Sequence, residues 1–237
     1  MTRSEKLREF MTASRVLLPT LPAQINMRLG VRNKNALSLH LDEIPVPDSK
    51  IAREAEEQCR EASPQRLVNH CHRTYVWGML LSHRDRLRPD PELLYVAAML
   101  HDLTLTDTFR DVNPMICFGA RGGVMAAEWA HERGWPDHRS ATLADAISLH
   151  LNAYVDPKHG PEAQLLQAGA AVDVIGLHLW ELSRETVHGV LTRYPLLDFT
   201  HGLAEFEFES RPHTRAQLLT RWLMFSTLAR HSPLLNK

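Results

Sequence analysis

Apolar residues recur every three or four positions along most of the chain, which is the spacing of helices with one buried face. Capping residues at Asp48 or Ser49, at Asp90 and at Ser183, and prolines that open helical stretches, mark where several of these helices begin. The pattern therefore predicts an all-α fold. The predicted helices cover residues 4–17, 49–61, 65–87, 92–103, 122–133, 137–151 and 162–177, a short stretch after Ser183, and 212–230.

Residues 18–47 break this pattern, because they carry four prolines and little periodicity. They predict an extended arm laid on the domain, with a weakly alternating stretch, LSLHLDEI, that leaves a short strand or hairpin open. Nothing after residue 48 resembles a linker. The expected organisation is an N-terminal helix and arm over residues 1–47, followed by one helical domain over residues 48–237.

Composition narrows the class of protein. The 237 residues are 44% hydrophobic and 23% charged, with a net charge of −1, so no basic surplus points to nucleic acid or an anionic membrane. Three cysteines without paired spacing argue against a disulfide framework. The N-terminus lacks a signal-like apolar run, and no window approaches about 18 apolar residues. We expect a cytoplasmic protein with a small-molecule substrate, no nucleic acid and no membrane partner.

The strongest chemical signal is His101–Asp102 at the end of the apolar run LLYVAAML. An imidazole and a carboxylate buried side by side are costly unless each has a partner, and one metal ion supplies both. The alternative is a solvated helix end. Asp173, in the nearly uncharged stretch LLQAGAAVDVIG, needs a cation or several donors for the same reason.

A third candidate lies in RLVNHCHRTYVWG. His70 and His72 are two positions apart and cannot share a helix face, so at most one of them reaches a common site. A satisfied core histidine is the simpler reading of either. Together with the residues above, His70 gives two imidazoles and two carboxylates from three helices. That mixed set suits zinc, iron(II) or manganese.

The chain resembles the HD-domain superfamily of metal-dependent hydrolases, most closely its cyanamide-hydratase-type branch, over about residues 45–230. The resemblance implies a helical bundle with one divalent metal, zinc first and iron or manganese as alternatives, held by His70, His101, Asp102 and Asp173. It implies that Asp102 also steers the attacking water. His150 and Arg73 are candidates for substrate contact or proton transfer. The motifs that carry it are IPVPDS at 44–49, NHCHRTYVWG at 69–78, LLYVAAMLHDLTLT at 93–106, AISLH at 146–150 and PEAQLLQAGAAVDVIG at 161–176.

Two positions depart from the family pattern. Thr104 stands where a glycine usually follows HDL, and Gly119 stands where the branch commonly has an acidic residue after phenylalanine. The favoured function is a hydratase or hydrolase that adds metal-activated water to a cyanamide- or nitrile-like molecule. These departures leave room for a binding module without catalytic activity.

Two other enzyme classes stay open, as does the oligomeric state. An HD phosphohydrolase acting on a nucleotide or phosphate ester would use cations such as Arg73, Arg110 and Arg121. A dinuclear iron HD oxygenase would need His131 and His150 as further ligands. Apolar residues in the N-terminal arm and in the last helix could serve a homo-oligomer or simply pack on the bundle.

Overall fold

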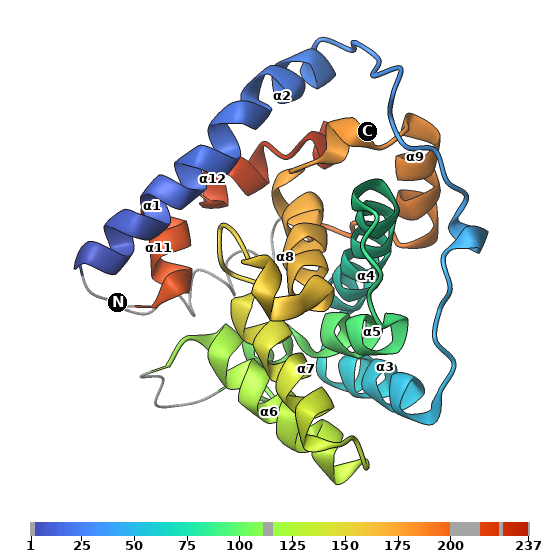
Figure 1. Cartoon of the computed structure of the whole chain (residues 1–237). Helices are drawn as coiled ribbons and strands as arrows, with labels where there is room; N and C mark the ends of the chain where they lie inside the picture. The colour runs from blue at the N-terminus through green and yellow to red at the C-terminus, as the bar shows by residue number, and fades with distance from the viewer. Residues whose placement is uncertain (1–2, 111–115, 200–213, 223–224, 237) are drawn as a thin grey trace.

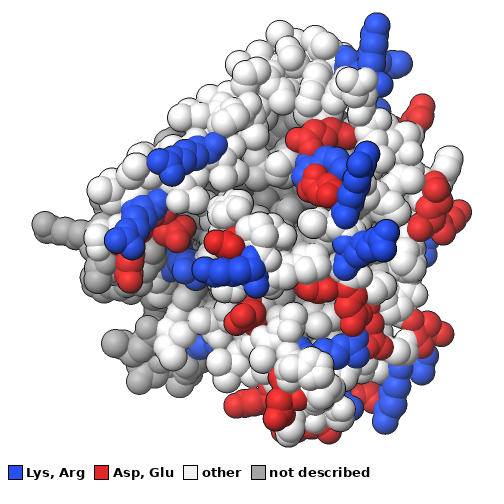
Figure 2. Space-filling model, viewed as in Figure 1, with Lys and Arg blue, Asp and Glu red and all other residues white. Residues whose placement is uncertain are grey.

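The computed structural model describes residues 3–110, 116–199, 214–222 and 225–236, and within these ranges it is all-α, as predicted. The only pairing of strand type there is an isolated bridge between Leu37 and Leu182. None of the described helices combines the length and apolarity needed to cross a membrane. On the face shown in Figure 2, side chains of both charge signs are interspersed.

Helices α4 and α8 form the centre of the molecule, and α5 and α7 pack against them (Figure 1). α6 packs on α7, and α3 packs mainly on α5. Every residue of α4 from Leu67 to Ser82 is buried, as expected for a central helix with apolar residues on all sides. These helices span Lys50–Ala62 (α3), Gln65–Asp85 (α4), Pro91–Leu100 (α5), Phe118–Glu132 (α6), Asp137–Leu149 (α7) and Gly160–Ile175 (α8).

Two glycines bring α4 and α8 close together. A Cβ on Gly169 of α8 would lie 2.2 Å from the carbonyl oxygen of Thr74, and one on Gly78 of α4 would lie 3.0 Å from that of Leu165. Both positions therefore require the absence of a side chain. The close approach places residues of α4 directly against the C-terminal half of α8, where Asp173 lies.

The predicted helix starts are confirmed at three caps. The side chains of Ser49, Asp90 and Ser183 each accept a backbone N–H from the first turn of the following helix. The prediction for α6 was late by four residues. This helix begins at Phe118, so the glycines of FGARGG lie inside its first turns.

The prediction of an extended arm from residue 18 is wrong for its first part. α1 (Arg3–Leu17) continues through a 3-10 turn (Leu18–Thr20) into α2 (Leu21–Arg28), and Pro19 and Pro22 occupy early positions where proline is compatible with a helix. Irregular chain then follows, apart from a 3-10 turn at Leu41–Glu43, and its single bridge replaces the possible hairpin.

Helices from both ends of the chain lie over the same side of the bundle. In Figure 1, α1 and α2 run across it beside α11 (Arg215–Trp222) and α12 (Phe225–Arg230). The predicted last helix is thus described as two segments, and residues 212–213 and 223–224 lie outside the described residues. α9 (Arg184–Arg193) lies on the other side of α8.

Candidate metal centre

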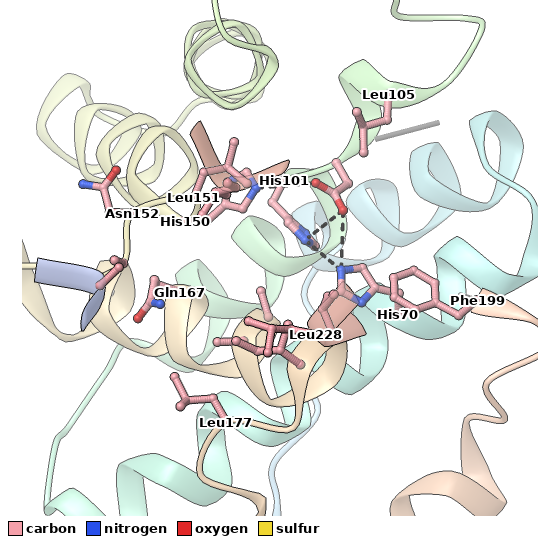
Figure 3. A pocket seen from close by; sticks show the side chains of 18 of the residues that line it. His70, His101, Leu105, His150, Leu151, Asn152, Gln167, Leu177, Phe199 and Leu228 are labelled. Atoms are coloured by element: carbon pink, nitrogen blue, oxygen red, sulfur yellow. Dashed lines mark hydrogen bonds and ion pairs between the residues drawn. The ribbon is translucent and has the colours of Figure 1, made fainter. Parts of the chain in front are cut away.

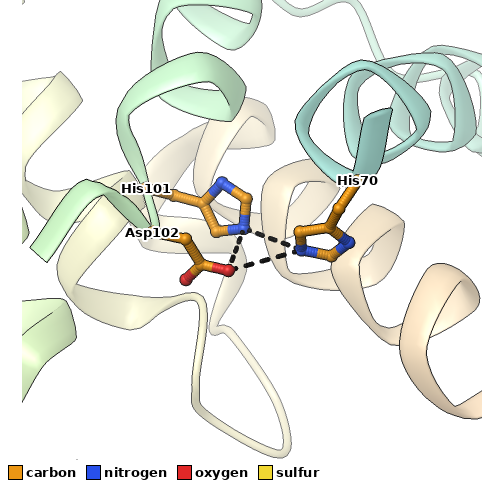
Figure 4. A group of neighbouring side chains, drawn as sticks. All are labelled: His70, His101 and Asp102. Carbon is orange, nitrogen blue, oxygen red and sulfur yellow. Dashed lines mark hydrogen bonds and ion pairs between the residues drawn. The ribbon is translucent and has the colours of Figure 1, made fainter. Parts of the chain in front are cut away.

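Three of the predicted metal ligands meet between helices: His70 from α4, and His101 and Asp102 from the end of α5 (Figure 4). The two Nε2 atoms lie 3.2 Å apart. Oδ2 of Asp102 lies 3.4 Å from Nε2 of His70 and 3.3 Å from Nε2 of His101. All three residues are buried, so their polar atoms face one another and have little access to solvent.

The hydrogen bonds around this group leave it rich in acceptors. Nδ1 of His101 donates to the carbonyl oxygen of Ala98 at 2.8 Å, and Nδ1 of His70 donates to Asp173 at 2.7 Å. Because each neutral imidazole carries one N–H, both Nε2 atoms then present lone pairs toward each other and toward the Asp102 carboxylate. In this neutral form, one bound cation would satisfy all three acceptors at once. Tetrahedral zinc, with bonds of about 2.0–2.1 Å, would space its ligands about 3.3 Å apart, which matches this donor set.

Asp173 lies on the opposite side of the His70 ring from these three atoms. Its Oδ1 accepts from Nε of Arg73 at 2.6 Å and from Nε1 of Trp77 at 2.9 Å. Its Oδ2 accepts from Nη2 of Arg73 at 2.9 Å and from Nδ1 of His70. The expectation that Asp173 needs a cation or several donors agrees with these contacts, and the cation beside it is a guanidinium.

Arg73 does not line the cavity next to the triad. It is 0% exposed, and besides its two bonds to Asp173 it donates from Nη1 to the carbonyl oxygens of Tyr194 and Pro195. A guanidinium that is fully buried needs this many acceptors. The structure therefore places Arg73 behind His70, and not where a substrate would contact it.

The buried charged groups around the triad shift the pKa values of the site residues. Burial lowers the pKa of His70, but hydrogen bonds that the ring donates to the Asp102 and Asp173 carboxylates, and their negative charge, outweigh it and raise that pKa to about 9. Without a metal ion the ring therefore takes up a second proton at neutral pH, and a cation that binds Nε2 would displace it. Burial opposes ionisation of both carboxyls, but the neighbouring cationic and imidazole groups keep the pKa of each below its ordinary value. Burial lowers the pKa of His101. Both carboxylates therefore stay charged at neutral pH.

His150, at the end of α7, faces the other oxygen of Asp102. Its Nδ1 donates to the carbonyl oxygen of Ile147 at 2.5 Å, and its Nε2 lies 3.5 Å from Oδ1 of Asp102. Gly119 packs against this ring, because a Cβ there would lie 3.2 Å from Cε1 of His150. A side chain at position 119 would push His150 aside, which gives the glycine at this departure from the family pattern a physical reason.

The other predicted residues lie elsewhere. Thr104 is buried and donates to the carbonyl oxygen of Phe118 at 2.9 Å. His131 has a side chain that is 66% exposed and pairs with Asp137, so it lies apart from the buried triad. His72 is buried on another face of α4, where it stacks on Tyr194. Of the histidines in NHCHR, only His70 reaches the site.

A cavity of about 130 Å³ opens onto the triad (Figure 3). Most of its walls are apolar and come from α1, α8, α11 and α12 as well as from the loop after α7. Figure 3 shows Asn152 and Gln167 well apart from His70, and Phe199 beside the His70 ring. Phe199 stacks on that ring at 4.5 Å between centroids. The polar residues in the lining are Arg66, His70, His101, Asp102, His150, Asn152 and Gln167.

The residues that line the cavity do not favour the phosphate-ester alternative. Of the arginines predicted to bind a phosphate group, Arg73, Arg110 and Arg121 are all absent from the described lining, and Arg66 is its cationic residue. Arg110 instead donates to the carbonyl oxygen of Leu105 at 2.9 Å. The described walls thus offer a hydrophobic environment, where a phosphate group would call for several cations.

Comparison with known proteins also favours a hydratase-like enzyme. No protein-family model matches the chain. This chain is similar to cyanamide hydratases. It is 25% identical to cyanamide hydratases DDI2 and DDI3 of Saccharomyces cerevisiae over 159 residues, which cover 65% of this chain and 69% of each of those proteins. This distant similarity supports a hydratase-like enzyme.

Some residues of the site were not found from the sequence. Trp77 lies four positions after Arg73 and seven after His70, so the helical spacing of α4 could have placed its indole near Asp173. Phe199 and the lining residues of α1, by contrast, are distant in sequence and carry no local signal. Only the tertiary packing of the chain brings them to the cavity.

Proposed function

We propose that the protein is a metal-dependent hydratase of the HD type, which adds water to the nitrile carbon of a cyanamide-like small molecule. The observation that carries this proposal is the set of three ligand atoms, 3.2–3.4 Å apart, at one end of an apolar cavity. The similarity to cyanamide hydratases supports the reaction type. In this reaction the oxygen of water bonds to the nitrile carbon, and its protons end on nitrogen, giving a urea without a leaving group.

Nε2 of His70, Nε2 of His101 and Oδ2 of Asp102 would hold one divalent ion, with zinc the best match to their spacing. Such an ion, when bound, lowers the pKa of water and polarises the group under attack. Asp173 supports the site through His70, since its carboxylate fixes the ring so that Nε2 faces the ion. Direct ligation by Asp173 would require its present hydrogen bonds to rearrange.

We assign two tasks to Asp102 and His150: to orient the attacking water and to transfer its proton. Oδ1 of Asp102 and Nε2 of His150, 3.5 Å apart, are two acceptors that can orient one water molecule between them and the cavity. Nε2 of His150 can take a proton from this water, since its Nδ1 is committed to Ile147, and can return it to the nitrile nitrogen. The apolar walls keep other water away from the reacting carbon.

The test is urea formation from cyanamide by protein purified without added metal, stripped with a chelator, and reloaded with zinc, iron(II) or manganese in turn. We expect the stripped protein to be inactive and reloading to restore activity. Asp102→Ala should abolish activity, and metal analysis should give one ion per chain. Full activity in the stripped protein would exclude the proposal. Phosphate release from nucleotides, with no urea formed from cyanamide, would assign the site to the phosphohydrolase class.

A further inference from the structure

We infer that the substrate carries an apolar group beside its reacting carbon, so that an N-alkyl or N-aryl cyanamide fits the site better than cyanamide itself. This inference rests on the proposed function and adds the substrate class. It comes from the walls of the cavity, because cyanamide is small and polar, whereas most of the described lining beyond the triad is aliphatic.

The size of the cavity sets the size of that group. A buried cavity of about 150 Å³ lined by aliphatic and aromatic side chains is known to hold benzene and to stay dry when empty. The cavity here measures about 130 Å³ and reaches the triad directly, since His70, His101, Asp102 and His150 all line it. It is therefore slightly smaller than a cavity that holds one benzene ring, so it has room for a short alkyl chain beside the reacting end, and a benzyl group tests its upper limit.

The position of the apolar walls supports the same substrate. Ala170, Ala171 and Val174 of α8 lie one to two helical turns along from Gln167, and form a wall of small side chains. Ala13, Val16 and Leu17 of α1 contribute further apolar surface.

A second aliphatic contribution comes from Leu219 and Leu228, in α11 and α12. Helices from the two ends of the chain thus cover the cavity with apolar side chains. Cyanamide has three heavy atoms and is polar, so it would not cover this apolar surface. An apolar substituent on the substrate would pack against the surface and be removed from water.

The experiment is a series of N-substituted cyanamides, from cyanamide through methyl, propyl and butyl to benzyl, assayed for urea formation with the metal-loaded enzyme. Each methylene that enters the cavity should raise kcat/KM about threefold to fourfold until the cavity is full. A series with flat or falling kcat/KM would overturn the inference while leaving the proposed hydratase intact.

A pair of adjacent leucines provides the matched variants. Leu17 lines the cavity, whereas Leu18 is 62% exposed and does not line it. Leu17→Ala should lower kcat/KM for the propyl compound about tenfold and change the value for cyanamide much less. Leu18→Ala should change neither. Equal losses on both substrates in Leu17→Ala would show a general structural effect and count against the inference.

Binding separates this inference from the proposed function. Isothermal titration calorimetry with benzylcyanamide and cyanamide, on the full-length protein stripped of metal, reports the cavity without catalysis. Tighter binding of benzylcyanamide, with a negative heat-capacity change, together with no turnover by any metal form, would support the apolar pocket and refute the hydratase. The absence of both binding and turnover would overturn the two together.

Discussion

The carboxylate of Asp173 accepts a hydrogen bond from Nδ1 of His70 at 2.7 Å, on the side of the ring away from His101 and Asp102. This contact fixes the tautomer that leaves Nε2 free to bind a cation. A histidine ligand whose other nitrogen is held by a carboxylate is a common arrangement in metal sites, because it fixes the ring and raises its basicity. Here the same carboxylate also neutralises the buried Arg73.

Asp173→Asn should weaken metal binding about 10- to 100-fold, measured by competition with a chelator, because the carboxylate no longer holds His70. It should also lower the free energy of unfolding by about 3–5 kcal/mol, since Arg73 would be left buried without its counter-charge. Leu81→Ala, at a buried position of α4 that does not line the cavity, is the control for a loss of stability alone. If X-ray absorption shows a second protein carboxylate on the bound metal, Asp173 is a direct ligand instead.

His150→Gln should keep the metal and lose turnover. The imidazole packs against the ring of His101, with 5.0 Å between centroids, and faces Oδ1 of Asp102. Its loss therefore removes a proton acceptor without removing one of the three closest ligand atoms. We expect kcat to fall about 100- to 10,000-fold with the metal content still at one ion per chain. His131→Gln, at an exposed position, should change neither value. Loss of a second ion in either variant would favour a dinuclear site.

Gly119→Ala should reduce kcat more than it reduces stability. The added Cβ would lie 3.2 Å from Cε1 of His150 and 3.3 Å from Cδ1 of Leu151, so the imidazole must move by a few tenths of an ångström. We expect kcat to fall about threefold to tenfold, because misplacement of a catalytic group is costly. Val124→Ala, at an exposed position of the same helix, is the control. An unchanged kcat in Gly119→Ala would argue against a role for the position of His150.

Glu56 should contribute to stability in acid. His72, whose Nε2 lies 3.4 Å from Oε1 of Glu56, together with hydrogen bonds from Arg60 and Tyr95, lowers the pKa of Glu56 to about 2 despite burial. The unfolded chain, with an ordinary pKa of 4.5, then binds more protons than the folded chain as pH falls from about 4.5 to 2.

This contribution is present above about pH 4.5 and is lost as the pH falls toward 2. With allowance for solvent screening, it amounts to about 1 kcal/mol. Urea unfolding at several pH values should show a smaller loss of stability in Glu56→Gln than in the parent protein over this window. Glu57→Gln controls for the change of charge. Parallel pH profiles for the parent protein and Glu56→Gln would contradict the assignment.

The helices were largely predictable because their signals are local. Apolar spacing and the caps at Ser49, Asp90 and Ser183 depend on neighbours within one turn, so they can be read along the chain. The error at residues 21–28 has a local cause too, since a proline near a helix start and a proline in an extended arm look alike in sequence.

By itself, the sequence determined the helical fold and placed His70, His101 and Asp102 among the candidate ligands, because buried polar residues in apolar helices need partners. Tertiary structure decided where the carboxylate of Asp173 points, because that depends on how closely α4 and α8 approach at Gly78 and Gly169. It also decided which apolar side chains from the two ends of the chain line the cavity, since such contacts join residues whose spacing along the chain carries no signal.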